Sequence, residues 1–290
     1  MRTWILLTGI ALVTAGVVAA QPPSVDIYLC TFEEVDGTIQ LGTPLNATAR
    51  EGYDNQPCFS PDGSYFLYAS LDSSGHTDVF RYVIDTGEVV RVTDTPEDEY
   101  SPTFVPGGDG FSSVRVETDG ATQRLWRFDL DGSNPRLVLA DVDSVGYHAW
   151  LDENTLALFI VGQPHALRLV DVREPDEQGI ALDIGRAVLP YRDTSDALFV
   201  ARHEESWWFH RLKRPSLEVE RLYELLAGSQ DTAWTPSGRL LMGVSAAIYV
   251  QDSASGTGWW RVAAFREVEG ITRIAVSPTG DRLAFVARDR

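Results

Sequence analysis

The sequence predicts an all-β protein, a six-bladed β-propeller with four strands in each blade. Strand-like residues are each followed by a tight turn, as in Phe59-Ser-Pro-Asp-Gly63 and Val276-Ser-Pro-Thr-Gly280. The six leading residues are Phe59, Phe104, Trp150, Tyr191, Trp234 and Val276, and they recur every 41 to 46 residues. A repeat of about 40–50 residues is typical of propeller blades. Helical periodicity is nearly absent from the sequence, with Glu218–Leu226 as the one candidate.

Each repeat contains four runs of β-branched, aliphatic or aromatic residues bounded by Gly, Asp and Pro. This composition favours short strands separated by turns. In the first complete repeat the runs are Pro57–Ser60, Tyr65–Ser70, Asp78–Ile84 and Val89–Thr93. In the next four repeats the predicted strands are Thr103–Phe104, Phe111–Glu117, Arg124–Leu130 and Arg136–Ala140; Ala149–Leu151, Thr155–Val161, His165–Val172 and Ile180–Ile184; Val188–Tyr191, Ala197–Arg202, Ser206–Leu212 and Glu218–Tyr223; and Thr232–Trp234, Leu240–Val244, Ala247–Gln251 and Trp259–Phe265.

The two ends of the chain predict how the ring closes. Only half a repeat, Thr272–Val276 and Arg282–Ala287, follows the fifth complete one. Near the N-terminus, Val25–Thr31 and Thr38–Leu41 supply two further strands around a turn at Asp36-Gly37. Together these four strands make one composite last blade, which joins the ring and pairs strand edges that would otherwise be exposed. We therefore expect one propeller domain over residues 21–290.

Two segments resemble the WD40-like repeat of TolB-type propellers. They are Phe59-Ser-Pro-Asp-Gly63 and Trp126-Arg-Phe-Asp-Leu-Asp-Gly132. The resemblance is clear over residues 54–140 and weaker over 144–226, and it implies a propeller that binds protein partners in the periplasm. TolB also carries a smaller α/β domain before its propeller, for which the sequence leaves no room between Ala20 and Val25. Similar repeats occur in propeller domains of serine peptidases and in some sugar lyases.

The first twenty residues have the layout of a secretory signal peptide. Arg2 precedes an apolar run from Ile5 to Ala20, which ends in small residues before Gln21-Pro-Pro23. This pattern predicts cleavage after Ala20. An uncleaved anchor is the alternative, although about 16 apolar residues are marginal for crossing a bilayer. We expect a periplasmic or secreted protein, with no membrane insertion after signal cleavage.

The chain is acidic, with a net charge of −18. Such a charge disfavours nucleic acid and anionic membrane surfaces as partners. It favours solubility and is compatible with a basic partner, and we expect a monomer. The densest acidic cluster, Thr93–Glu99, should link two blades and could attract a basic loop or remain a solvated connection.

Two cysteines, Cys30 and Cys58, lie on predicted strands of neighbouring blades. In an oxidising compartment they can form one disulfide, and the alternative is two buried thiols. Two cysteines alone cannot make a structural zinc site. The sequence leaves both cysteine states open.

The loops that lead into the innermost strands should converge on the central channel. Alignment of the repeats places a polar ring of mixed charge there. Its members are Asp54, Asn55, Gln56, Glu99, Tyr100, Ser101, Tyr147, His148, Arg186, Gln230, Asp231, Thr272 and Arg273. We expect this ring to be a partner-binding rim, able to hold a small ligand, a metal or the peptide tail of a partner.

The sequence predicts no catalytic residue, no metal site and no cofactor. It contains neither a Gly-x-Ser-x-Gly nucleophile elbow nor a His-Glu-x-x-His zinc motif. His148 with Asp54, Glu99 and Asp231 is the one metal-like set, but ring positions of propellers are commonly polar and merely hydrated.

Adjacent tryptophans occur at Trp207-Trp208 and at Trp259-Trp260. Aromatic faces can stack on sugars, but neighbouring strand residues point to opposite faces of a sheet. Because both faces of a blade pack against other blades, we expect these rings in the core, together with Trp126, Trp150 and Trp234.

The sequence therefore favours a secreted or periplasmic propeller that binds a protein or peptide partner through its rim loops, as a scaffold or adaptor. The alternative is a periplasmic propeller enzyme, such as a lyase or hydrolase, that acts on a small molecule or sugar at a site in the central channel.

Overall fold

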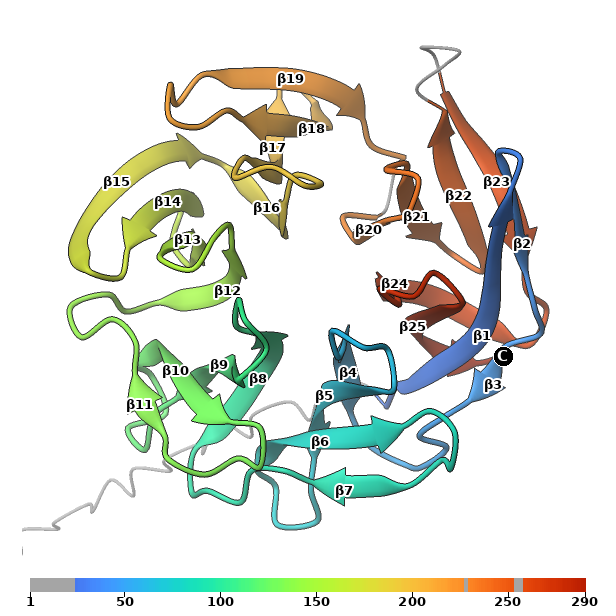
Figure 1. The fold of residues 1–290 in the computed structure, drawn as a ribbon, viewed down its shortest axis with the longest axis horizontal. Coiled ribbons are helices and arrows are strands. Elements are labelled where there is room, and N and C mark those ends of the chain that lie inside the picture. Colours follow the sequence, from blue (N-terminus) through green and yellow to red (C-terminus); the bar gives the residue numbers. More distant parts are fainter. Residues whose placement is uncertain (1–23, 227–228, 253–257) are drawn as a thin grey trace, which may run out of the picture.

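The computed structural model describes residues 24–290 except 227–228 and 253–257, and its strands form six sheets around a central axis (Figure 1). The predicted six-bladed propeller with four-stranded blades is confirmed. The expected signal peptide, residues 1–20, lies outside the described residues. The described part contains no α-helix, and so no helix long and apolar enough to cross a membrane.

Five blades are each built from four consecutive strands. The first strand in the sequence is the innermost, and the others follow outward as antiparallel neighbours. The blades are blade 1, β4 (Asp54–Phe59), β5 (Tyr65–Leu71), β6 (Thr77–Val83) and β7 (Val89–Arg91); blade 2, β8 (Asp98–Phe104), β9 (Gly110–Val116), β10 (Gln123–Asp129) and β11 (Arg136–Leu137); blade 3, β12 (Val145–Trp150), β13 (Thr155–Ile160), β14 (Ala166–Asp171) and β15 (Glu174–Leu182); blade 4, β16 (Ile184–Pro190), β17 (Ala197–His203), β18 (Ser206–Leu212) and β19 (Val219–Glu224); and blade 5, β20 (Thr232–Trp234), β21 (Leu240–Val244), β22 (Ala247–Asp252) and β23 (Gly258–Ala264).

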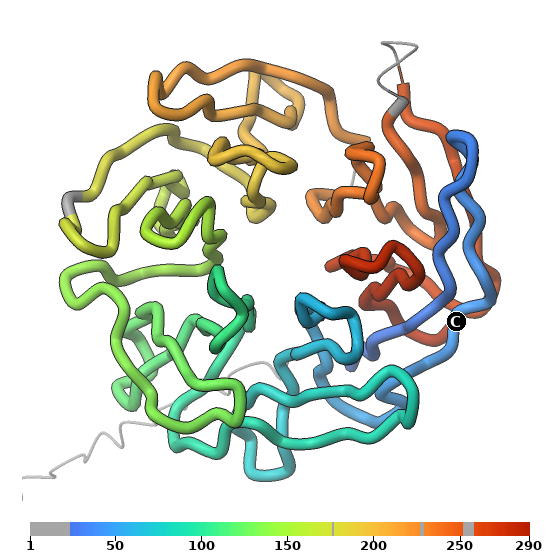
Figure 2. Tube along the Cα trace, viewed as in Figure 1, coloured from blue at the N-terminus to red at the C-terminus, as the bar shows by residue number. Residues whose placement is uncertain are grey.

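The sixth, composite blade joins the two ends of the chain. From the channel outward its order is β24 (Val268–Val276), β25 (Arg282–Asp289), β1 (Asp26–Val35) and β2 (Thr38–Leu41), and the short β3 (Leu45–Asn46) also pairs with β1. The antiparallel register sets Asp26 opposite Ala287 and Thr31 opposite Arg282. Figure 2 shows the first strands of the described chain beside its C-terminal ones. The predicted ring closure is therefore confirmed.

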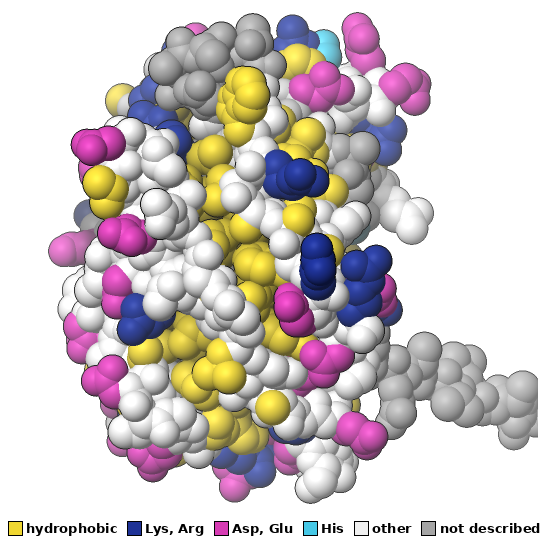
Figure 3. Space-filling view, turned by 90° about the vertical axis from the view of Figure 1, so that its right-hand side faces the viewer, with side chains coloured by type: hydrophobic (Ala, Val, Ile, Leu, Met, Phe, Trp, Pro, Cys, Tyr) yellow, Lys and Arg dark blue, Asp and Glu magenta, His cyan; other side chains and the backbone are white. Residues whose placement is uncertain are grey.

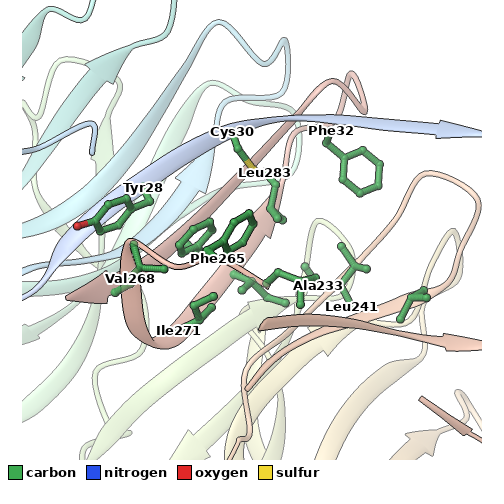
Figure 4. Packing of buried hydrophobic residues seen from close by; sticks show 14 residues of the cluster. Tyr28, Cys30, Phe32, Ala233, Leu241, Phe265, Val268, Ile271 and Leu283 are labelled. Atoms are coloured by element: carbon green, nitrogen blue, oxygen red, sulfur yellow. The ribbon is translucent and has the colours of Figure 1, made fainter. Parts of the chain in front are cut away.

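The hydrophobic core lies between the blades. Six clusters of buried apolar residues fill the six interfaces between neighbouring blades. Strand β25 shows why: Leu283, Phe285 and Ala287 pack toward blade 5, whereas Ala284 and Val286 pack toward blade 1. Successive strand residues point to opposite faces, so a middle strand that is apolar throughout serves two interfaces. Figure 4 shows the cluster between the composite blade and blade 5.

At the end of the fourth repeat the predicted outer strand, Glu218–Tyr223, is confirmed within one residue as β19 (Val219–Glu224), which pairs with β18. The helical periodicity noted over Glu218–Leu226 does not produce a helix. The alternating exposure of β19 fits a strand with one face on the blade. Strand β15 begins earlier than expected, at Glu174, and the innermost strand of the next blade begins at Ile184.

Not every tryptophan lies in the core. Trp126, Trp150 and Trp234 pack against interface clusters, as expected. Trp260 is 61% exposed on β23, the outermost strand of blade 5, since an outermost strand turns one face to solvent. Figure 3 looks at this side of the ring, where apolar side chains interrupt the polar surface.

Both cysteines are free thiols. Cys30 packs in the cluster toward blade 5, beside Leu283 (Figure 4). Cys58 lies on β4 of blade 1, which adjoins the opposite face of the composite blade. The disulfide considered from the sequence is therefore not formed, because the composite blade separates the two side chains.

Candidate functional site: the central channel

The innermost strands carry bulges at matching places. The register with the next strand shifts after Asn55, Tyr100, Val145, Ile184 and Thr272. Three bulge residues, Gln56, Ser101 and Arg273, have positive φ angles of 59°, 53° and 50°. Few non-glycine residues adopt this conformation, and a bulge redirects a side chain. All three residues line the channel.

The channel contains two hollows. The upper hollow, about 700 Å³, lies at the face where the innermost strands begin, and its lining includes Tyr53, Gln56, Tyr100, Tyr147, Phe159, His165, Arg186, Trp207 and Gln230. The lower hollow, about 500 Å³, follows the innermost strands to their ends, and its lining includes Phe59, Phe104, Trp150, Trp234, Val276 and Pro278. Four residues, Gln56, Tyr147, Arg186 and Gln230, line both hollows and mark the waist between them.

A hydrogen bond crosses the channel at the waist. Arg273 Nη2 donates to Tyr147 Oη at 2.6 Å, and the guanidinium also lies 4.8 Å from the centre of the Tyr147 ring. The composite blade and blade 3 stand opposite each other in the ring (Figure 1). The two side chains therefore form a bar across the channel and link blades that share no interface.

Asp231 of blade 5 anchors the same bar. Arg186 donates from Nε to Asp231 Oδ1 at 3.0 Å and from Nη2 to Oδ2. Arg273 Nη1 lies 3.6 Å from Asp231 Oδ1. Burial alone would lower the pKa of Arg186, but the Asp231 carboxylate raises it above its usual value. The waist is thus a fixed cluster in which one carboxylate serves two guanidiniums.

Two glutamines at the waist tie neighbouring blades together. Gln56 Oε1 accepts a hydrogen bond from the backbone N of Ser101 at 2.8 Å, and Gln230 Oε1 accepts one from the backbone N of Arg186 at 3.1 Å. Each bond spans one blade interface at the level of the bulges. These amides therefore hold the channel wall in a single arrangement.

Four expected rim residues, Asp54, Asn55, Glu99 and Thr272, line neither hollow. Asp54 is fully buried and accepts hydrogen bonds from Arg50 Nη2 at 2.7 Å and Nε at 3.2 Å. Asn55 Oδ1 accepts from the backbone N of Gln56 at 2.8 Å, next to the bulge. These residues support the wall from behind.

Glu99 is buried between blades 1 and 2. Its carboxylate accepts hydrogen bonds from Arg115 Nε at 2.9 Å, Thr95 Oγ1 at 2.7 Å and Thr93 Oγ1 at 3.0 Å. Burial raises the pKa of Glu99 to about 7, against the lowering effect of these partners. The inner end of the acidic run Thr93–Glu99 is therefore a connection inside the protein, whereas Asp94 stays exposed.

His148 is a buried, neutral residue. Its Nε2 lies 2.7 Å from Ser112 Oγ, which also accepts a hydrogen bond from Trp150 Nε1 at 2.9 Å. Burial lowers the pKa of His148 to about 3. His148, Asp54, Glu99 and Asp231 do not come together, and the described residues contain no group of three or more His, Cys, Asp or Glu able to hold a metal.

Three residues that line the upper hollow, Tyr53, His165 and Trp207, are absent from the predicted ring. Tyr53 precedes the first innermost strand, and burial raises its pKa to about 12, which keeps its hydroxyl protonated. Trp207 begins β18 and His165 precedes β14, so both stand where a second strand leads to a third. Those connections lie at the same end of the blade as the starts of the innermost strands, and counting them would have revealed both residues.

The three-dimensional neighbours share the whole propeller. A candidate TolB from Agrobacterium tumefaciens superposes with a TM-score of 0.71 at 16% identity, covering 91% of this chain and 99% of that one. The fold is that of the TolB-type propellers. TolB from Acinetobacter baumannii aligns with a TM-score of 0.57 at 11% identity, over 93% of this chain and 66% of that one.

Two further similar proteins carry names other than TolB. An oligogalacturonate lyase in complex with manganese aligns with a TM-score of 0.55 at 14% identity, over 94% of this chain and 99% of that one. In sequence, an uncharacterized protein of Agrobacterium fabrum, Atu1656, is 28% identical over 109 residues. That match spans 36% of this chain and 37% of the relative, so the chain covers little more than a third of its length. No protein-family model matches the sequence.

Proposed function

We propose that this chain is a periplasmic or secreted propeller that binds a protein or peptide partner at the upper hollow, as a scaffold or adaptor. The observation that carries this proposal is the composition of the hollow. Its described lining contains no carboxylate, thiol or primary amine, and its ionisable side chains are Arg186, His165 and tyrosines. Such a lining lacks the pair of carboxylates on which most glycoside hydrolases rely.

The residue types in the upper hollow suit recognition. Tyr, Trp and Arg side chains dominate the energy of protein interfaces, and the hollow presents Tyr53, Tyr100, Tyr147, Trp207 and Arg186. Below them, the waist is held by hydrogen bonds between blades. A pre-organised surface loses little conformational entropy on binding, so a partner would meet a rigid receptor.

The periplasmic location is part of the proposal and is tested separately. The layout of residues 1–20 supports export, and TolB-type structures share the fold. Expression of the full chain in its source organism, followed by fractionation and N-terminal sequencing, should give a protein that begins at Gln21. A protein that keeps Met1 and stays in the cytoplasmic fraction would contradict the proposal.

The second candidate is an enzyme that acts on a small molecule or sugar in the channel. It is favoured by the likeness to an oligogalacturonate lyase over nearly the whole propeller. The described residues provide no metal-binding group of His, Cys, Asp or Glu to accompany that likeness. We therefore place partner binding first.

A binding experiment on two matched tryptophan variants distinguishes partner binding from enzyme activity. The mature protein is immobilised, a partner is captured from an extract of the source organism's cell envelope, and its affinity is then measured by calorimetry. Trp207→Ala should weaken binding at least about tenfold, as expected for a central aromatic anchor. Trp208→Ala is the control, because this adjacent ring does not line the hollow.

Equal affinity of both variants and the wild type would contradict the proposal. Release of product from oligogalacturonate by the wild-type protein would support the enzyme instead.

A further inference from the structure

The charges at the waist do not balance. Apart from histidines, the described residues that line the two hollows include three with a formal charge: Arg186, Arg273 and Asp231. All three line the lower hollow, and Arg186 also lines the upper one. The waist therefore carries one excess positive charge inside a protein whose net charge is −18.

Arg273 is the guanidinium without a full partner. Arg186 takes both oxygens of Asp231, whereas Arg273 reaches that carboxylate only at 3.6 Å. Its Nη2 bonds to the neutral Tyr147 hydroxyl, and its Nε has no hydrogen-bond partner among the described residues. The Arg273 side chain is only 19% exposed. At this partly buried place Arg273 shares a single carboxylate with Arg186, so its guanidinium can pair with a further counter-charge that enters the channel.

Most of the remaining lining of the lower hollow is apolar, although Ser101, Thr103, His148 and Thr232 also belong to it. Phe59, Phe104, Ala149, Val188 and Val276 belong to its lining, together with Trp150 and Trp234. Its volume of about 500 Å³ falls within the range of small-molecule sites. The hollow thus combines an apolar body with one cationic end, and guanidinium groups pair with carboxylates through two parallel hydrogen bonds.

We infer that the lower hollow binds an organic carboxylate, whose anionic head pairs with Arg273 at the waist and whose apolar body fills the channel. This chemistry occurs in a free monocarboxylic acid and in the C-terminal carboxylate of a peptide tail. The site lies on the far side of the waist from the upper hollow, so this inference goes beyond the proposed partner binding and does not depend on it.

The backbone at Arg273 has the bulge conformation that Gln56 and Ser101 share, and it directs the side chain into the channel. Its φ of 50° belongs to the left-handed region, a conformation that persists where the surroundings impose it. The register of β24 and β25 shifts across this position, between Thr272 and Ala275. The bulge therefore places the guanidinium at the waist, and Tyr147 holds it there until a carboxylate arrives.

Calorimetry and thermal unfolding test the inference on the mature protein. The probes are octanoate and octanamide, and a four-residue apolar peptide with a free or an amidated C-terminus. We expect at least one carboxylate to bind at least about tenfold tighter than its amide, and to raise the melting temperature through preferential binding to the folded state. The probe that binds identifies the source, a free acid or a peptide terminus.

Two variants assign the binding to the waist. Arg273→Gln should lose the preference for the acid over the amide, while Arg173→Gln, which alters an exposed pair with Asp171, should keep it. Tyr147→Phe removes the competing hydroxyl from Arg273 and should tighten binding several-fold, which a merely structural role would not produce. This second variant decides the question if Arg273→Gln does not fold.

The inference is overturned if neither acid binds better than its amide, if Arg273→Gln binds like the wild type, or if Tyr147→Phe leaves binding unchanged or weaker. Saturation of the lower hollow should leave the Trp207-dependent affinity for a partner unaltered. Failure of either proposal can therefore be recognised independently of the other.

Discussion

Arg273 and Tyr147 come from opposite blades and meet across the channel, with 2.6 Å between Arg273 Nη2 and Tyr147 Oη. In a propeller, each blade otherwise packs against its two neighbours, as the six interface clusters do here. A bond across the diameter couples blades that are three positions apart. The waist therefore contributes to the integrity of the ring as well as to the shape of its two hollows.

Asp231 should be the most sensitive residue of the waist. Asp231→Asn removes the only carboxylate among the described residues that line the two hollows, and leaves Arg186 and Arg273 close together without a counter-charge. Loss of one partner of a buried ion pair typically costs about 3–5 kcal/mol. We expect a loss of this size in the free energy of unfolding, measured with urea.

The control for Asp231 is an exposed pair. Asp171→Asn breaks the Arg173 pair at the surface, where such pairs contribute about 0–1 kcal/mol. The double variant Asp231→Asn with Arg273→Gln should be more stable than the single variant, since it removes the excess cation. A single variant as stable as the wild type would show that the two guanidiniums do not need Asp231.

Phe285 should control closure of the ring. It is fully buried and stacks between Tyr28 of β1 and Phe265, with centroid distances of 5.6 and 5.5 Å. Phe285→Ala removes contacts to the N-terminal strand and to blade 5 at once, and should cost about 3–5 kcal/mol in urea unfolding.

The same variant should expose the first strands to protease. Limited proteolysis of Phe285→Ala is expected to cut near Asp36-Gly37, the turn between β1 and β2, before it cuts the other blades. Val89→Ala, at a residue that is 47% exposed, should leave stability and cleavage unchanged. Uniform cleavage of all blades in Phe285→Ala would contradict a specific role in closure.

The sequence was sufficient for the fold because the repeat is local. Each blade can be recognised in the sequence by a turn such as Phe59-Ser-Pro-Asp-Gly63. The half repeats at the two ends of the chain can complete the ring only by pairing with each other. The repeat predicted a strand at Glu218–Tyr223, and pairing with β18 outweighs the helical periodicity of Glu218–Leu226. Tertiary pairing commonly overrides such weak preferences.

The candidate site was harder to predict, because exposure depends on partners far away in the sequence. Glu99 looked like a rim carboxylate, but Arg115 of the next strand holds it inside the wall. Asp231 and Arg273 looked alike as ring positions, and only the bulge geometry and the 3.6 Å contact show them sharing a cluster. No pattern in the sequence gives the direction of a side chain at a bulge.

His148 should make the protein less stable as the pH falls. Its pKa is about 3 in the folded protein and about 6.5 in an unfolded chain. Between these values the unfolded state takes up a proton that the folded state does not, so this stabilisation is complete above about pH 6.5 and declines by about 1.4 kcal/mol per pH unit below it. In His148→Gln, urea unfolding at pH 4 to 7 should lose this rise of stability with pH, so the slope of the unfolding free energy against pH becomes more negative than in the wild type, whereas the exposed control His203→Gln should keep the wild-type slope.

Glu99 should have the opposite effect over an overlapping range. Its pKa is about 7 when folded and about 4.3 when unfolded. The unfolded state therefore loses its proton first, and the stabilisation present below about pH 4.3 is lost as the pH rises through 7. Glu99→Gln should remove this contribution and leave that of His148, so the slope of the unfolding free energy against pH becomes more positive than in the wild type, whereas the exposed control Glu153→Gln should leave the slope unchanged.

Because the two effects oppose each other between about pH 4.5 and 6.5, they should largely cancel in the wild type. The double variant that combines Glu99→Gln with His148→Gln should then resemble the wild type in the slope of its unfolding free energy against pH over this range. A Glu99→Gln slope equal to that of the wild type would show that Arg115 keeps the Glu99 carboxylate ionised.

The two cysteines should remain thiols even in an oxidising compartment. Cys30 faces blade 5 across the core and Cys58 lies in blade 1, so no small movement brings their sulfurs together. Burial raises the pKa of Cys30 to about 12 and also raises that of Cys58, which suppresses the reactive thiolate. The native protein should therefore react with neither a thiol reagent nor a reductant, two thiols should titrate in denaturant, and reductant should leave the melting temperature unchanged. Loss of two protons by mass, together with a lower melting temperature in reductant, would instead require a disulfide and a different arrangement of β1 and β4.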